Sequence, residues 1–322
     1  MKRTIAVFVV LAIFPLVMQA MDGLFYVSLA SRILIYAIAA TSLNLVLGYG
    51  GMVSFGHAAF FGAGAFVVGI LAVEGVRSAW IAWPVAIAVA ALAALVIGAM
   101  SLRTRGVYFI MITLAFAQMI YYIFVSLKTY GGDDGLSMPG RSTLGMGIDL
   151  RNDLAWYYLV LVLLALVLYG LHRLVNSRFG RVIDAIRENE ARAEAIGFPV
   201  YRYKLLCFVI SGAVAGLAGA LIANQSNYVS PSLLHWIQSG TLMIMVILGG
   251  VGTIWGGLIG ATVLLALEHL IADYRIGWIA SWAPNYQDHA GLAVGVVLLT
   301  IVMLAPEGIA GLRWKMSRKR HA

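Results

Sequence analysis

Charge is what this chain has least of. Only 11% of its 322 residues are Asp, Glu, Lys or Arg, whereas soluble domains carry about 25%. Hydrophobic residues make up 62% and the mean hydropathy is +0.92. These values exclude a soluble domain and indicate an integral membrane protein. At roughly 20 residues per crossing, the chain has room for about ten spans and none for a separate soluble domain. We therefore expect one all-α, polytopic transmembrane domain over residues 1–322.

Several chemical devices are also missing. The single cysteine, Cys207, lies in an apolar run, so no intrachain disulfide can form. No lysine follows a glycine, which excludes the GxxxxGK[ST] phosphate-binding loop and with it the usual binding of ATP. No H-E-x-x-H metal motif occurs, because Glu268-His269 has the reverse order and no second histidine follows it. We expect no enzymatic activity, no metal and no cofactor on this chain.

Acidic residues are absent from the middle of every apolar run. A pump driven by protons or sodium generally needs ionisable groups inside its spans. All 14 acids fall near span ends or in loops. Glu268 and His269, near the end of a run, keep an ion-coupled secondary transporter open as an alternative. Otherwise any energy for transport is expected to come from another subunit.

Apolar runs bounded by charged or turn residues predict ten spans. They cover residues 4–22, 24–47, 51–73, 79–100, 106–126, 155–172, 204–224, 232–250, 253–272 and 290–306. With a cytoplasmic N-terminus, sixteen of the 22 Lys and Arg lie on the cytoplasmic side and six on the outer side. The positive-inside rule then places both termini in the cytoplasm, including a basic tail at 307–322. The basic surplus is thus an orientation signal facing membrane lipid, and it lacks the interleaved aromatics of a nucleic-acid surface.

The first apolar run resembles a signal peptide, because Lys2 and Arg3 precede its hydrophobic core. Met18-Gln19-Ala20 is a poor small-x-small cleavage site. We expect this run to be a retained membrane anchor.

One polar segment, residues 173–204, interrupts the apolar sequence with seven basic and four acidic residues. Within it, apolar residues recur at helical spacing over 179–196, and Gly197-Phe198-Pro199 ends the pattern. Arg181 with Asp184, and Glu188 with Arg192, have the spacing of surface ion pairs. The segment is either a rigid element that receives work from a cytoplasmic motor or a solvated connector lying on anionic lipid. The pattern alone favours neither.

Polar groups enter the apolar surroundings of residues 43–66 at Asn44, Ser54 and His57, and glycines interrupt the helical pattern between them. A broken helix can expose backbone groups to a zwitterion where it lines protein or water. A short turn with Ser54 and His57 bonding neighbouring helices is the simpler alternative. Thr113 and Gln118, five residues apart, are further candidates for the pathway lining.

Glycines elsewhere indicate close helix packing, at Gly212, Gly216 and Gly219 and again at Gly256 and Gly260. The longest outer segment, 128–153, contains a Gly-Gly-Asp-Asp-Gly turn. It is either a solvated loop or a surface for a partner.

Six segments together resemble a known family. They are SRFGRVIDAIRENEARAEAIGFPVYRYKLLCFVISGAVAGLAGAL at 177–221, LNLVLGYGGMVSFGHAAFFGAGAF at 43–66, RGVYFIMITLAFAQ at 105–118, TYGGDDGL at 129–136, GGVGTIWGGLIGA at 249–261 and APEGIAGL at 305–312. The chain resembles, over nearly its whole length, the LivM-type permeases of ATP-binding-cassette (ABC) importers for branched-chain amino acids. LivM-like permeases also serve urea, short amides and aromatic acids.

The resemblance implies a permease subunit of the bacterial inner membrane that forms half of a translocation pathway. It implies three kinds of partner: a second, LivH-like permease, cytoplasmic ATPases that bind the ATP, and an extracytoplasmic solute-binding protein. The coupling residues it implies are Arg187, Glu188, Asn189 and Gly197, with Glu190 or Glu194 approximating the family's glutamate. The strict Glu-Ala-Ala-x-x-x-Gly spacing of many ABC importers is absent here.

Overall fold

Helices dominate the structure. The computed structural model describes residues 2–21, 23–145, 149–273, 290–305 and 308–311. Its long helices are α1 (Lys2–Ala20), α2 (Leu24–Asn44), α3 (His57–Val73), α4 (Ala79–Ser101), α5 (Val107–Ser126), α6 (Asp153–Val175), α9 (Val200–Ser226), α10 (Trp236–Gly249), α11 (Gly256–Asp273) and α13 (Ala290–Leu304). Five helical stretches are long and apolar enough to cross a membrane: 24–49, 79–101, 107–126, 153–175 and 200–226. Shorter apolar helices accompany them, as predicted for a polytopic all-α membrane protein.

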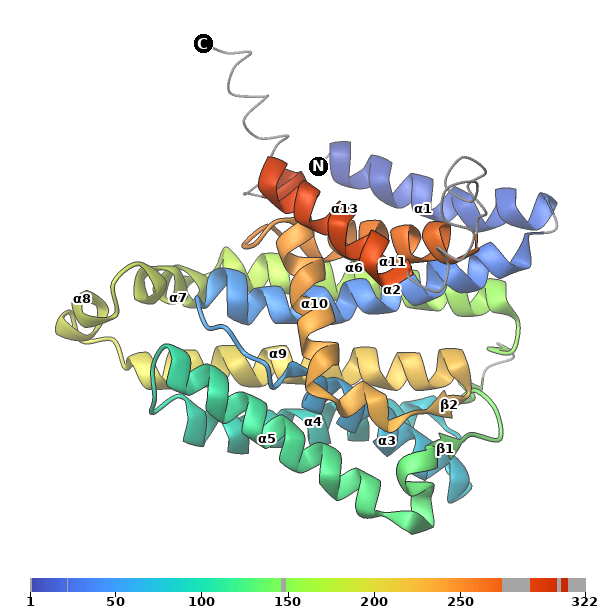
Figure 1. Cartoon of the computed structure of the whole chain (residues 1–322), viewed down its shortest axis with the longest axis horizontal. Helices are drawn as coiled ribbons and strands as arrows, with labels where there is room; N and C mark the ends of the chain where they lie inside the picture. Colours follow the sequence, from blue (N-terminus) through green and yellow to red (C-terminus); the bar gives the residue numbers. More distant parts are fainter. Residues whose placement is uncertain (1, 22, 146–148, 274–289, 306–307, 312–322) are drawn as a thin grey trace.

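Most of these helices run roughly along one axis, and α10 crosses them steeply (Figure 1). Helices α3, α4 and α9 pack on one another, while α2 packs on α6, α9 and α11. Because α2 and α9 are in contact, the two groups share one buried apolar core. The long polar segment, carrying α7 (Arg178–Glu188) and α8 (Glu190–Ala195), projects from one end of the bundle (Figure 1).

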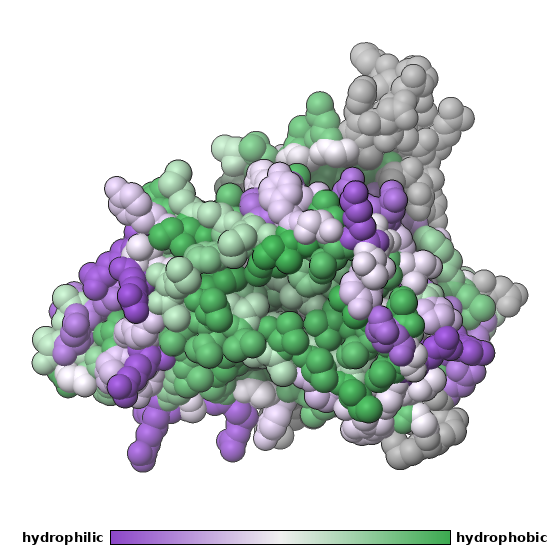
Figure 2. All heavy atoms as spheres, turned by 90° about the horizontal axis from the view of Figure 1, so that it is seen from below, coloured by the Kyte–Doolittle hydropathy of each residue, from purple (hydrophilic) through white to green (hydrophobic). Residues whose placement is uncertain are grey.

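The surface polarity matches a membrane-spanning body. Figure 2 shows a broad apolar region between two polar ends, one of them at α7 and α8. Large side chains on this body are exposed, among them Trp80, Leu92, Met111 and Leu166. Exposed aliphatic surface of this extent is stable against lipid or a partner, not against water.

Close glycine packing is confirmed in the core. A Cβ on Gly64 would collide with the carbonyl of Gly216, and a Cβ on Gly219 would collide with the carbonyl of Phe61. In the same way Gly260 lies against the backbone of Met245. Backbones approach this closely only where no side chain intervenes, so these glycines set the spacing of α3 against α9 and of α10 against α11.

The predicted span 51–73 is only partly helical. Helix α2 continues into a π-helical turn, η1 (Leu45–Tyr49), after which residues 50–56 are non-helical and α3 starts at His57. Gly51 has a φ of +66°, a conformation that side chains other than glycine rarely adopt. The glycine pair at 50–51 therefore ends the helix, and the following residues continue as a non-helical segment that leads to α3. We call residues 50–56 the re-entrant segment.

The prediction of one continuous helix over 179–196 is wrong. Asn189 is extended, with φ −157° and ψ 101°, and it separates α7 from α8. Its Oδ1 accepts a hydrogen bond from the amide of Arg192 at 2.9 Å, so Asn189 is the N-cap of the second helix. The predicted helix end is confirmed, because Gly197 has a φ of +92°.

Residues 128–145 and 149–153 lie at the end of the bundle opposite α7 and α8 (Figure 1). Two short 3-10 turns, η2 (Lys128–Tyr130) and η3 (Gly132–Asp134), contain the glycine-rich turn. Strand β1 (Leu136–Ser137) then pairs antiparallel with β2 (Tyr228–Val229), which follows α9. The 3-10 turn η4 (Pro231–Leu234) leads from β2 into α10. Most of the basic tail 307–322 lies outside the described residues.

Candidate functional site

The re-entrant segment is held inside the bundle by α10. Ser239 Oγ donates to the carbonyl of Phe55 at 2.8 Å and accepts from the amide of Ala58 at 2.8 Å. Ser54 Oγ accepts from the amide of Gly56 at 3.1 Å. These hydroxyls satisfy backbone groups that no helix satisfies, which a non-helical segment inside a membrane requires.

His57 begins α3 and is completely buried. Its Nε2 lies 2.9 Å from Ser211 Oγ of α9, and that hydroxyl also donates to the carbonyl of Ser42 on α2. Since the Ser211 proton goes to Ser42, Ser211 Oγ accepts from His57 Nε2–H, and Nδ1 is left without a partner among the described residues. The imidazole thus joins α2, α3 and α9. This geometry suits helix bonding, the simpler of the two sequence interpretations.

Asn44 ties α2 to the loop before α11. Its Nδ2 donates to the carbonyl of Thr253 at 2.7 Å, and its Oδ1 accepts from the amide of Gly252 at 2.8 Å. The side chain is 1% exposed and both ends of its amide are satisfied. Asn44 therefore fastens the end of α2 to the loop before α11 and offers no free group to a solute.

The two candidates on α5 lie in different environments. Thr113 is buried against the re-entrant segment, since a Cβ added at Gly56 would lie 3.2 Å from the carbonyl oxygen of Thr113. Gln118 is partly buried, and its Nε2 has no partner among the described residues. The structure therefore brings Ser54, Thr113 and the backbone of residue 56 together, and it leaves Gln118 farther along α5.

The coupling candidates are mostly exposed at the α7–α8 end. Glu188, Asn189, Glu194 and Gly197 are all open to solvent, and no atom lies within 4 Å of a Cβ added at Gly197. Arg187 is different, because its Nη1 donates to the carbonyl of Gly48 in η1 at 2.5 Å. The sequence predicted ion pairs of Arg181 with Asp184 and of Glu188 with Arg192, and neither forms among the described residues. Arg187 instead lies 3.9 Å from Asp184.

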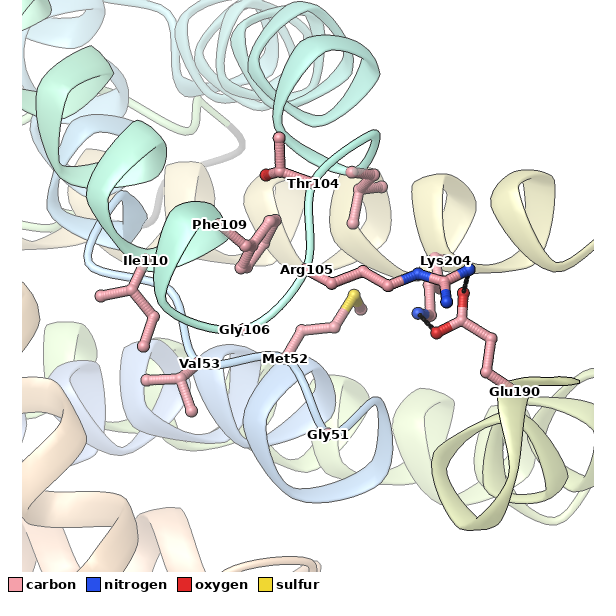
Figure 3. A pocket seen from close by; sticks show the side chains of 11 residues that line it. Gly51, Met52, Val53, Thr104, Arg105, Gly106, Phe109, Ile110, Glu190 and Lys204 are labelled. Carbon is pink, nitrogen blue, oxygen red and sulfur yellow. Dashed lines mark ion pairs between the residues drawn. The ribbon is translucent and has the colours of Figure 1, made fainter.

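Glu190 points back to the membrane domain. Its carboxylate lies 2.7 Å from Lys204 Nζ at the start of α9 and 3.3 Å from Arg105 in the loop before α5. These side chains border a cavity of about 220 Å³ between that loop and Gly51–Val53 (Figure 3). We call Arg105, Glu190 and Lys204 the ion-pair latch, because it fastens α8 to two other segments.

Two cavities and a close packing contact follow one side of α5 from its start to its end. The latch cavity includes Phe109 and Ile110 at the start of α5, and Thr113 packs on Gly56 one turn later. At the far end a cavity of about 390 Å³ is bordered by Tyr121, His235 and Gln238. We call this line, between α5 on one side and the re-entrant segment and α10 on the other, the α5 seam.

Sequence reasoning missed the latch and the partners of His57. Arg105 and Lys204 are 99 residues apart in the sequence, so no local spacing brings them to Glu190. Ser211 and Ser239 read as ordinary small residues in apolar spans. The only feature that marks them is a hydroxyl group within an apolar helix. Small residues of this kind are common wherever membrane helices pack closely, so they do not indicate a site.

Comparison with known proteins identifies the family. The family described as branched-chain amino acid transport system / permease component matches residues 25–305. The high-affinity branched-chain amino acid transport permease LivM of Escherichia coli K12 is 28% identical over 88% of this chain and 69% of its own length. A probable LivM of Methanocaldococcus jannaschii is 26% identical over 85% of this chain and 90% of its own.

This chain is also similar to permeases of the LivH type. The LivH permease of Escherichia coli K12 is 25% identical over 86% of this chain and 91% of its own length. No solved structure matches this chain. The family match covers most of the transmembrane body, including the re-entrant segment, the latch and the α5 seam. The chain belongs to the branched-chain amino acid permease family of ABC transporters and is a multi-pass, non-catalytic transport subunit.

Proposed function

We propose that this subunit imports branched-chain amino acids across the bacterial inner membrane and forms half of the translocation pathway. In this proposal ten spans cross the membrane with both termini in the cytoplasm. A LivH-like permease supplies the other half of the pathway, two ATPases hold the ATP, and a binding protein delivers the solute from outside. The names of the relatives from Escherichia coli support the solute class. Urea, short amides and aromatic acids are the alternative solutes.

The observation that carries the proposal is the α5 seam. Helix α5 has only three buried residues, Phe109, Thr113 and Ala117, which repeat every four positions. Its other faces carry exposed large side chains such as Tyr108, Met111 and Tyr122. An apolar helix with one narrow buried stripe, cavities at both ends and a non-helical segment beside it suits the wall of a pathway completed by a second subunit.

The α7–α8 segment supports coupling to an ATPase. Its exposed acids and amide at Glu188, Asn189 and Glu194 are available to a partner, whereas Arg187 bonds the end of the helix that precedes the re-entrant segment. A movement of α7 would therefore be transmitted to the pathway wall through the hydrogen bond between Arg187 and Gly48. Glu190, committed to the latch, is better suited to holding α8 in place than to touching the ATPase.

The test is transport by the reconstituted complex. The permease pair, its ATPases and its binding protein are placed in proteoliposomes, and uptake of radiolabelled leucine, isoleucine and valine is compared with uptake of urea, acetamide and phenylacetate. We expect ATP-dependent uptake of the aliphatic amino acids alone. Uptake without ATP that a proton ionophore abolishes would identify an ion-coupled transporter instead, and preference for urea or an amide would replace the solute.

A pull-down tests the coupling surface separately. The charge-reversed variant Glu188→Arg should lose the copurifying ATPase and keep the second permease, because it alters the exposed end of α7 and leaves the Arg187 bond to Gly48 in place. An ATPase that copurifies equally with both forms would contradict the assigned coupling surface.

A further inference from the structure

Arg32 is a cation inside a membrane-spanning helix. It lies eight residues after the start of α2, at a depth of roughly 12 Å along the helix axis. Among the described helices it is the one Lys or Arg that lies more than two turns from both helix ends. A charge at such a position costs a few kcal/mol or more against lipid and generally marks a functional site.

Arg32 forms no ion pair with a carboxylate of the described residues. The guanidinium lies over the ring of Tyr36, 5.7 Å from its centroid. Glu268 of α11 is close enough to interact electrostatically with Arg32, but no ion pair joins the two within 4.0 Å. The side chain is exposed, so its donors remain open to a ligand.

The space beside Arg32 is a cavity of about 390 Å³ between α2 and the end of α9. Such a volume is within the range of about 300–1,000 Å³ that small-molecule sites occupy. Tyr228 of β2 and Leu233 of η4 border the cavity, which places it toward the end of the bundle opposite α7 and α8 (Figure 1). In the proposed topology this is the extracytoplasmic end.

Gln225 near the end of α9 borders the same cavity. Its Nε2 donates to Ser28 Oγ at 2.8 Å and to the carbonyl of Ser28 at 3.3 Å, which ties α9 to α2 beside Arg32. Because a carbonyl can only accept, this contact fixes which end of the amide is nitrogen. The other end, Oε1, is buried and has no surface open to the cavity. Gln225 therefore holds one wall of the cavity in place.

Aliphatic side chains form part of the lining, with Leu29 on α2, Ile222 on α9 and Leu233 on η4. Hydroxyl-bearing side chains border the rest: Ser28, Tyr36, Ser226, Tyr228 and Ser230. The cation and the aliphatic part of the lining correspond to the carboxylate and the side chain of an aliphatic α-amino acid. A bare phosphate or carboxylate would use the cation and leave the aliphatic part without a function.

We propose that this cavity is an outer binding site of the permease itself for an aliphatic amino acid, with the carboxylate of the solute on Arg32. The solute class rests on the proposed function above. We call it the Arg32 site. It lies outside the α5 seam and receives the solute separately from any binding protein.

The test is leucine binding to the purified permease–ATPase complex in phosphatidylcholine nanodiscs without binding protein. Equilibrium binding of radiolabelled leucine is measured for wild type, Arg32→Gln, Arg32→Lys and the matched control Arg77→Gln, which removes an exposed arginine between α3 and α4. Arg32→Gln should weaken binding by about tenfold or more, as loss of a charged hydrogen-bond partner does. Arg32→Lys should recover part of the affinity, and the control should bind as wild type does.

Analogues identify the groups that are recognised. Leucinol, which lacks the carboxylate, should compete weakly with leucine in wild type, and Arg32→Gln should abolish most of that discrimination. Equal competition by leucinol and leucine in wild type would overturn the proposal. So would leucine binding that Arg32→Gln does not change, or a wild-type complex that binds no leucine at about 1 mM, the level of a very weak complex.

The remaining arms separate this site from a lipid site and from the transport function. If native mass spectrometry shows that Arg32→Gln loses a copurifying anionic phospholipid while leucine binding is unchanged, the cation holds a lipid phosphate and the proposal is wrong. If the full importer takes up leucine with ATP but the nanodisc complex does not bind it, the Arg32 site fails and the proposed function stands.

Discussion

Arg187 Nη1 donates to the carbonyl of Gly48 over 2.5 Å, which links the exposed helix α7 to the π-helical end of α2. Carbonyls in a π-helical turn at a helix end have few partners within the helix. A side chain from a distant segment completes this one. The polar loop and the pathway wall are therefore in direct contact.

Removing that contact should uncouple ATP hydrolysis from transport. Arg187→Ala is expected to lower ATP-driven uptake by about tenfold, the effect of losing one charged hydrogen bond. The subunits should still copurify. Arg181→Ala, on the same helix and also exposed, is the matched control. Equal losses of uptake in both variants would mean that charge on α7 matters and the bond to Gly48 does not.

The latch assigns Glu190 a role different from that of Glu194. Glu190→Gln should loosen α8, because it breaks contacts to both Lys204 and Arg105, and should lower the melting temperature of the detergent-solubilised protein. Part-exposed ion pairs are worth about 1 kcal/mol or less each, so a shift of a few degrees is expected. ATPase copurification should remain. Glu194→Gln, which breaks no ion pair, should leave the melting temperature unchanged, and a variant of Glu190 that lost the ATPase would contradict the latch.

Substitution by alanine is expected to change the stability of the protein in opposite directions at two glycines. Gly64→Ala should destabilise the protein by about 1–3 kcal/mol, because its methyl group collides with backbone of α9 and neither backbone can yield cheaply. Gly170→Ala in α6 meets no atom within 4 Å and should be neutral or stabilising by about 0.5–1 kcal/mol through helix propensity. Thermal unfolding in detergent measures both, and similar shifts for the two would refute the packing argument.

Ser239 is expected to hold the re-entrant segment by itself. Ser239→Ala leaves the carbonyl of Phe55 and the amide of Ala58 without their side-chain partner, at a cost of about 1–3 kcal/mol for each buried group. Stability and leucine uptake should both fall. Thr241→Ala, two residues along α10 and exposed, removes only a bond within the helix. If Thr241→Ala is as harmful as Ser239→Ala, the segment is held by other contacts.

Composition and hydropathy could predict the helical membrane class because burying apolar surface dominates the energetics of every span. They could not predict where the third span begins. Residues 51–56 belong to an apolar run, but Gly51 adopts a positive φ and the segment is non-helical up to His57. The break at Asn189 was hidden for a similar reason, since the apolar stripe continues across it while the asparagine side chain caps a new helix.

The sequence indicates some of the candidate residues and not others. Asn44, Ser54 and His57 stand out as polar groups in apolar surroundings, and all three make the buried contacts that such groups require. Arg32 lies eight residues into an apolar run, which marks it as a charge within a span. Only the folded arrangement brings Gln225 to the same cavity.

The re-entrant segment has a mechanical consequence. A helix transmits force as a rod, because shortening it breaks a ladder of hydrogen bonds. Residues 50–56 have no such ladder: Arg187 bonds the turn just before them, and Ser239 pins Phe55 near their inner end. Between those two anchors the chain can lengthen or shorten by rotating a few dihedral angles. The segment can therefore change length without breaking a helical ladder, so that the helices on its two sides, α2 with η1 and α3, can shift relative to each other.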